Sequence, residues 1–180
     1  GNLPQADTVA AIETHHLMPT IFDLESACFY ASNTHETVRV FVKVDVGLER
    51  FGIPAPQAVE FIKEVRELPN LEVHGVYAHV DVPDAPGSDE YINWQFETYT
   101  RVCQELEDTG VEIPTKMVAS SAVLGFSAAM SLSAVDPGHM LFGLLPPGPR
   151  SVDVELRPAL HALTSRLIHA RKLDRKEFVE

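Results

Sequence analysis

The sequence predicts an α/β fold in which parallel strands alternate with helices. Strand-like and helix-like segments alternate in units of roughly 30 residues, which is typical of β–α repeats. The strand-like segments are short and rich in β-branched residues, as expected for strands that are buried on both faces. The 180-residue chain is 45% hydrophobic and 22% charged, which is ordinary for a globular domain and excludes intrinsic disorder.

The first half of the chain shows this alternation clearly. The predicted elements are a helix over 6–16, a strand over 19–22, a helix from its N-cap Asp23 to about Ser32, a strand over 38–45 and, after a loop, a helix opened by Pro56. In the last of these helices Val59, Ile62 and Val65 recur at helical spacing, which predicts a single buried stripe.

The second half continues the pattern and then changes character. We predict a strand over 72–80, a loop over 81–88, a helix over 89–108 ended by Gly110, a strand over 114–119, a helix over 121–130 and a strand over 133–136. The proline-rich stretch at 146–149 then forms a rigid connector. A single long strand is expected over 158–173, with no helix after it.

Two architectures fit repeated β–α units, a (β/α)₈ barrel and a doubly wound sheet. No GxGxxG follows a strand, and no GxxxxGK[ST] occurs in the sequence, which weighs against a nucleotide-binding sheet. A (β/α)₈ barrel takes about 250 residues. In that architecture the chain is a partial TIM-type barrel of about five strands.

Charge and hydrophobicity argue against nucleic acid as a partner and against a membrane span. The net charge is −12, and 21 of the 26 acidic residues lie in 1–149, so nucleic acid is a poor partner. The basic residues after 149 suit either a binding patch or a solvated strand end or linker. No apolar run is long enough to span a membrane, and the first ten residues do not resemble a secretory signal.

The two cysteines bear on compartment and metal binding. Cys28 and Cys103 stand far apart, in no metal-ligand spacing, so we expect free thiols in a reducing cytosol and no metal site.

Polar residues gather where the predicted strands end, which in β/α barrels is where the active site lies. They are Lys43, Asp45 and Arg50 after one strand, His79 and Asp81 after the next, Ser120 and Ser121 after the third, and Asp136, Gly138 and His139 after the fourth. Each also has an ordinary interpretation: a surface ion network, a core histidine, a helix cap or a turn. Their coincidence at successive strand ends favours a site.

The chemistry of these strand ends indicates an anion site beside a flat ring. A hydroxyl at Ser121, helix-terminal N–H groups and close backbone approach at Gly138 can hold a phosphate. An acid can pair with a protonated ring nitrogen, a histidine can lie against the ring, and an arginine can grip a carboxylate. These needs match pyridoxal phosphate together with an amino acid.

Five segments, in order, resemble motifs of the alanine racemase family. They are LMPTIFDLES at 17–26, KVDVGLERFGI at 43–53, VHGVYAH at 73–79, ASSA at 119–122 and VDPGHMLFGL at 135–144. The resemblance implies a fold-type III pyridoxal-phosphate enzyme that interconverts L- and D-alanine, a cytoplasmic homodimer of D-amino-acid metabolism. It also implies that 1–149 is part of the barrel and that 150–180 holds a connector and the first strand of a C-terminal β domain.

The resemblance assigns roles by position. Lys43 matches a lysine that is often carbamylated and supports a neighbouring arginine. Arg50 matches that arginine, which contacts the substrate carboxylate and the phenolic oxygen of the cofactor. His79 matches the histidine near the cofactor ring. The catalytic set is therefore Lys43, Arg50 and His79, and the cofactor-binding set is His79, Ser120, Ser121, Asp136, Gly138 and His139.

Some positions depart from the family pattern. Ser120 stands where the family usually has Asn, and Val46 and Leu48 replace Thr and Met. Asp136 stands where alanine racemases carry an arginine that bonds the pyridine nitrogen. A carboxylate there favours the protonated ring and makes it a stronger electron sink.

The family's lysine segment A-[VI]-x-K-[AS]-[ND]-A-Y-G has no match in this sequence, and neither has its catalytic tyrosine. Racemisation needs acid/base groups on both faces of the Cα. Three hypotheses follow: part of an alanine racemase; part of another fold-type III enzyme, namely a racemase of a different amino acid, a decarboxylase or an aldolase; or a cofactor-binding fragment without chemistry.

Overall fold

Parallel strands paired in the order in which they occur in the chain form the centre of the protein. The computed structural model describes residues 6–160, 162 and 164–170. The sheet runs β1 (Thr20–Ile21), β2 (Val38–Asp45), β4 (Leu71–Ala78), β5 (Thr115–Ser120) and β6 (Ala134–Asp136), and the short β3 (Ile53–Pro54) pairs with β2. Every pairing is parallel. The carboxyl ends of the strands therefore lie at the same edge of the sheet.

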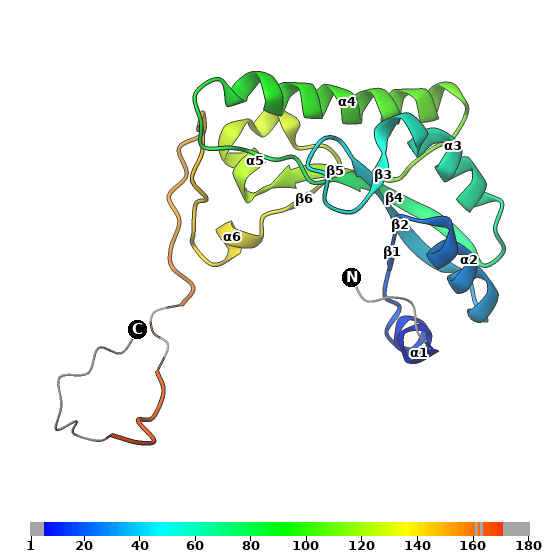
Figure 1. The fold of residues 1–180 in the computed structure, drawn as a ribbon, viewed down its shortest axis with the longest axis horizontal. Coiled ribbons are helices and arrows are strands. Elements are labelled where there is room, and N and C mark those ends of the chain that lie inside the picture. The colour runs from blue at the N-terminus through cyan, green and yellow to red at the C-terminus, as the bar shows by residue number, and fades with distance from the viewer. Residues whose placement is uncertain (1–5, 161, 163, 171–180) are drawn as a thin grey trace, which may run out of the picture.

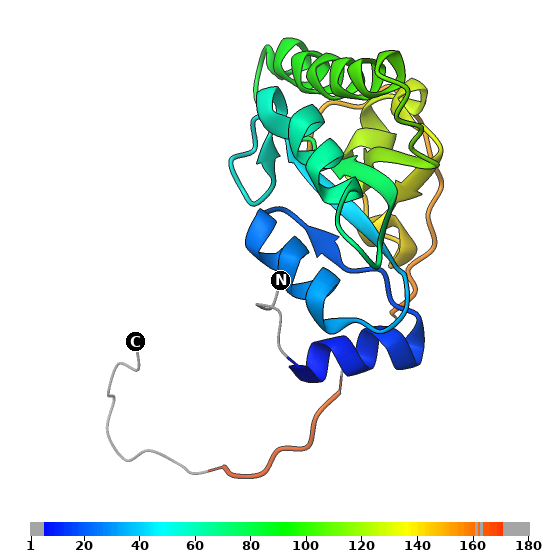
Figure 2. The ribbon, with the colours of Figure 1, turned by 90° about the vertical axis from the view of Figure 1, so that its right-hand side faces the viewer.

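This strand order distinguishes the two architectures that the sequence left open. A doubly wound sheet reverses its strand order, whereas here each step along β1–β2–β4–β5–β6 goes in the same direction. With right-handed crossovers, steps in one direction place successive helices on one face. Figures 1 and 2 show α2 (Leu24–Asn33), α3 (Ala55–Arg66) and α4 (Ser88–Asp108) following one another over the sheet. The fold is therefore part of a singly wound barrel.

The two faces of the sheet differ in burial, as strand β2 shows. Its valines at alternate positions, from Val38 to Val44, are buried under the helices, whereas Phe41, Lys43 and Asp45 on the opposite face are half-buried. In a closed barrel both faces of each strand are buried. Lys43 and Asp45 are therefore held on the concave side of the sheet.

Helix α4 has a buried stripe at helical spacing that includes polar residues. Its inward positions include Ile92, Gln95, Tyr99, Val102 and Leu106. The stripe follows the three- and four-residue spacing that packs a helix on a sheet. Two of these five side chains are polar, so their hydrogen-bonding groups need partners inside the protein.

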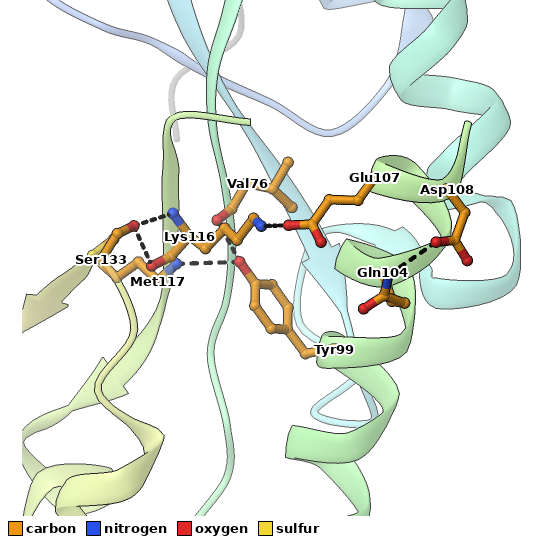
Figure 3. A network of polar contacts seen from close by, with 8 residues as sticks. All are labelled: Val76, Tyr99, Gln104, Glu107, Asp108, Lys116, Met117 and Ser133. Atoms are coloured by element: carbon orange, nitrogen blue, oxygen red, sulfur yellow. Dashed lines mark hydrogen bonds and ion pairs between the residues drawn. The ribbon is translucent and has the colours of Figure 1, made fainter. Parts of the chain in front are cut away.

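Tyr99 satisfies that requirement by joining two strands. Its hydroxyl donates to the carbonyl of Val76 on β4 at 2.6 Å and accepts from the N–H of Met117 on β5 at 3.1 Å (Figure 3). Burial is the main reason that the pKa of Tyr99 is raised, so the hydroxyl keeps the proton that it donates. At the exposed end of the helix, Lys116 of β5 pairs with Glu107.

Most predicted elements are confirmed, with local differences. Strand β3 and helix α6 (Gly138–Leu141) occur where loops were expected. The helix predicted over 121–130 is divided into α5 (Ser121–Phe126) and a 3₁₀ turn over Ala128–Met130, because Ser127 adopts an extended conformation. Helix α1 (Ala6–His15) ends one residue earlier than predicted, because His16 has a φ of +50°, outside the helical region.

The strand predicted over 158–173 is wrong for its described part. Residues 158–160, 162 and 164–170 carry no strand pairing, and 171–173 lie outside the described residues. Extended backbone becomes a strand only when a neighbour accepts its hydrogen bonds. Here only Ala159, bonded to the carbonyl of Phe142, has such a contact among the described residues of 158–170. Among the described residues, no helix is long and apolar enough to cross a membrane.

Replacing Tyr99 with phenylalanine tests the link between β4 and β5. The change keeps the ring and removes the hydroxyl, so two buried backbone groups lose a partner. We expect the free energy of unfolding, measured by urea denaturation, to fall by about 1–3 kcal/mol. Tyr30→Phe is the control, because Tyr30 is also buried and its hydroxyl has no hydrogen bond among the described residues. An equal loss in the two variants would contradict this role of Tyr99.

Candidate active site at the carboxyl ends of the strands

The loop after β2 is wound tightly and presents Arg50. Glu49 and Phe51, on either side of Arg50, have φ values of +55° and +54°, which are unusual for residues other than glycine. The Asp45 carboxylate accepts the N–H groups of Gly47 and Glu49 at 3.0 and 3.1 Å. These bonds hold the strained turn closed. The loop thereby projects Arg50 from the end of the strand.

Gly52 allows the loop to return against β2. A Cβ at this position would lie 2.8 Å from the backbone nitrogen of Asp45, and the φ of +128° disfavours any other residue. Gly52 of the sequence motif is thus explained by the close packing of this loop.

Lys43 contacts the same loop from the strand. Its Nζ donates to the carbonyl of Arg50 at 3.2 Å and lies 5.9 Å from the centre of the Tyr77 ring. Burial lowers the pKa of Lys43, and the nearby charge of Arg50 lowers it further, against the opposing effect of Asp45. The ion network considered from the sequence is not formed, since Asp45 bonds to backbone groups and the salt bridges among the described residues lie elsewhere.

His79 follows β4 directly and is half-buried. Burial lowers its pKa, and the charges of Arg50 and Lys43 lower it further, while Asp136 and Asp81 act in the opposite direction. His79 therefore lies within electrostatic reach of residues from β2, its loop and β6. The structure brings these sequence candidates to one place.

Ser120 and Asp136 end neighbouring strands and stand directly opposite each other in the β5–β6 register. Asp136 is exposed as a residue, but partial desolvation of its carboxyl group raises its pKa, and His79 lowers it in turn. The Asp136 carboxyl group and the His79 imidazole therefore lie within electrostatic reach of each other at the carboxyl ends of β6 and β4.

Ser121 connects the start of α5 with α6. Its side chain is 2% exposed, and its Oγ accepts the N–H of Met140 at 3.1 Å, which leaves its own proton free to donate. A Cβ added to Gly138 would meet nothing within 4 Å, so space lies beside the backbone there. His139 is exposed, and its carbonyl accepts the N–H groups of Phe142 and Leu144.

Known proteins show which family has this arrangement. A family model described as the N-terminal domain of alanine racemase matches residues 1–146. The chain belongs to the alanine racemase family. The resemblance seen in the five motifs is thereby confirmed.

Individual relatives agree. An alanine racemase of Methanococcus maripaludis is 40% identical over 110 residues, which cover 60% of this chain and 29% of that protein. An alanine racemase of Desulfovibrio desulfuricans is 31% identical over 173 residues, which cover 94% of this chain and 46% of that protein. The chain thus spans less than half the length of these alanine racemases.

A solved structure supports the fold. The structure of an alanine racemase of Clostridium difficile 630 in complex with cycloserine is similar with a TM-score of 0.78 and 27% identity, over 88% of this chain and 44% of the other. The α/β partial barrel predicted from the sequence is confirmed by this likeness and by the strand order.

Two polar residues near the candidate site of this chain were not among the residues predicted from the sequence. Tyr77 lies beside Lys43, and its hydroxyl is 3.2 Å from Oγ1 of Thr20. Gln95 is fully buried and is bonded to the backbone of Asp81, two residues after His79. Gln95 could have been found from the sequence, because it is a polar residue at a position where the spacing of α4 requires an inward side chain.

The lowered pKa of His79 predicts a pH effect on stability. The unfolded chain takes up this proton at a higher pH than the folded chain. His79 therefore stabilises the fold fully above about pH 6.5, and this contribution is lost as the pH falls through the folded-state value. In His79→Gln, the unfolding free energy from urea melts should decline less steeply between about pH 7 and 5.

His15→Gln is the matched control, since His15 is exposed on α1. Its stability profile should follow that of the unmodified protein. A profile for His79→Gln that is as steep as the unmodified one would show that His79 does not titrate in this way.

Proposed function

We propose that this chain is part of a pyridoxal-phosphate-dependent amino-acid racemase that interconverts L- and D-alanine. The observation that carries the proposal is the meeting of Lys43, Arg50, His79 and Asp136 at one end of the sheet, in a member of the alanine racemase family. Because the chain covers less than half of its relatives, activity and substrate are proposed for the whole protein.

The residues present fit pyridoxal phosphate. Ser121 has a free hydroxyl proton, and Gly138 has open space beside its backbone, so both suit a phosphate group. Ser120, and the backbone at His139, stand next to them. His79 supplies a flat ring, and Asp136 a carboxylate for the ring nitrogen. When bound, the cofactor withdraws electrons from the Cα of an amino acid and so makes its proton easier to remove.

Arg50 binds and orients the substrate in this proposal. Its guanidinium is held beyond the end of β2 by a strained loop and is free to grip a carboxylate with two hydrogen bonds. Lys43 donates a hydrogen bond to the backbone carbonyl of Arg50 and so fixes that loop to β2. The loop geometry therefore sets the distance between the bound carboxylate and His79.

Asp136 favours a second candidate function. It differs from the arginine of the family motif that it matches, and a carboxylate stabilises a protonated ring nitrogen where arginine does not. A stronger electron sink suits other reactions at the Cα as well. The second candidate is therefore another fold-type III enzyme: a racemase of a different amino acid, a decarboxylase or an aldolase.

The remaining features of the proposal follow from the family. We propose that residues 1–149 form part of the barrel and that 150–180 lead to a C-terminal β domain. The whole enzyme is proposed to be a cytoplasmic homodimer of D-amino-acid metabolism. Two free cysteines, Cys28 and Cys103, are compatible with that compartment.

A product assay of the full-length protein tests the function. With pyridoxal phosphate and L-alanine, D-alanine should form and be detected by chiral chromatography. Loss of carboxylate as CO₂, or products of Cα–Cβ cleavage from hydroxy amino acids, would support the second candidate. No turnover of any tested amino acid by a cofactor-loaded protein would leave only cofactor binding and would contradict both enzyme proposals.

Asp136→Arg separates the two candidates. Arginine restores the family motif, so we expect side reactions to fall relative to racemisation, measured as the product ratio. Asp136→Asn is the control, because it removes the charge without adding the guanidinium. An unchanged product ratio in both variants would show that Asp136 does not determine the reaction.

Ser121→Ala tests the phosphate site by binding alone. Loss of one charge-assisted hydrogen bond is worth about 1.5–3 kcal/mol, so the affinity for pyridoxal phosphate should fall by about tenfold or more in equilibrium dialysis. Ser127→Ala is the control, since Ser127 lies at the other end of α5. Equal affinity in the Ser121 variant would place the phosphate elsewhere.

A further inference from the structure

The side chain of Gln95 is completely buried in α4, where an apolar residue would be expected. Its amide oxygen accepts the N–H of Asp81 at 2.9 Å, and its amide nitrogen donates to the carbonyl of Asp81 at 2.9 Å and to that of Tyr91 at 3.4 Å. Both backbone groups of Asp81 are therefore bonded to one side chain.

This pairing occurs where the sheet no longer supports the chain. The ladder between β2 and β4 ends at Val44 and Ala78, and the ladder between β4 and β5 ends at Tyr77 and Met117. The backbone that follows Ala78 pairs with no strand in the part of the chain that the structure describes. The Gln95 amide takes the place of that strand, because it offers one donor and one acceptor in parallel as a peptide group does.

Two anchors from α4 thus lie on either side of His79. Tyr99 holds the carbonyl of Val76, three residues before it, and Gln95 holds Asp81, two residues after it. Val80, between the histidine and Asp81, is 1% exposed and is fixed by packing. Hydrogen bonds from α4 therefore fix the backbone on both sides of His79.

We propose that Gln95 is a positioning residue of the cofactor site, which fixes the extension of β4 so that His79 faces the ring-binding space. The site itself rests on the function proposed above. Gln95 touches neither cofactor nor substrate in this proposal and acts through the backbone of Asp81. A merely structural role would require only a well-packed side chain, whereas this role requires both of its hydrogen bonds.

The first readout does not need the cofactor. His79 faces Lys43 of β2, Arg50 of the following loop, Asp81 of its own strand extension and Asp136 of β6. In Gln95→Leu the extension is released and His79 gains solvent, so its pKa, measured by NMR titration of the full chain, should rise toward the ordinary value of about 6.5. Gln95→Met keeps the length of the side chain and removes both hydrogen bonds without adding a charge, and it carries the same test if the leucine variant does not fold.

Two control variants separate positioning from loss of stability. Gln104→Leu changes the same residue type on the same helix, where Gln104 is exposed and bonds to Asp108 (Figure 3). Val102→Ala leaves a cavity in the same buried stripe of α4 and lowers stability without removing a hydrogen bond. We expect neither to move the His79 titration. An unmoved titration in the Gln95 variant, or an equal movement in Val102→Ala, would overturn the proposal.

The second readout is affinity for pyridoxal phosphate, measured by equilibrium dialysis. Outer-shell partners of metal ligands contribute about tenfold or more to metal affinity. By the same argument, Gln95→Leu should bind the cofactor about tenfold more weakly, and Gln104→Leu as tightly as the unmodified chain. If the unmodified chain binds no cofactor, the proposed function fails, while the titration of His79 still decides whether Gln95 positions it. Unchanged affinity in the Gln95 variant would overturn its role in the cofactor site.

Discussion

The attachment of helix α4 to strand β4 is the constraint on which the site depends. Two polar side chains of one buried stripe, Gln95 and Tyr99, bond to the backbone at both ends of the segment that carries His79. Buried polar groups are costly unless they are paired, and these are paired with the main chain of β4 at Val76 and of its extension at Asp81. Helix position, strand path and histidine position are therefore coupled.

The opposite side of the site depends on local strain. The loop after β2 has non-glycine residues with positive φ on both sides of Arg50, and the Asp45 carboxylate and the Lys43 ammonium hold it through backbone groups. Strained backbone persists where its surroundings determine it fully. Lys43 and Asp45, for which the sequence also allowed a surface ion network, bind backbone groups and shape this loop instead. The guanidinium of Arg50 forms no salt bridge among the described residues, so it is available to a ligand.

Much of the fold could be predicted from the sequence because hydrophobic periodicity and glycine or proline breaks are local signals. The strand over Val38–Asp45 has the predicted bounds, and the long helix begins at Ser88, one residue earlier than predicted. Strand β3 was missed because two residues have no periodicity. The strand expected over 158–173 failed in its described part because pairing is not a local property.

The sequence by itself determined the residue types at the strand ends and their order, and hence the resemblance to one family of enzymes. The tertiary structure decided which of them meet: Lys43 with the Arg50 carbonyl, Ser120 opposite Asp136, and Ser121 with α6. It also revealed Gln95, whose partner Asp81 is 14 residues away in the chain. Hydrogen bonds to backbone groups leave no mark on the partner's residue type, so only coordinates show them.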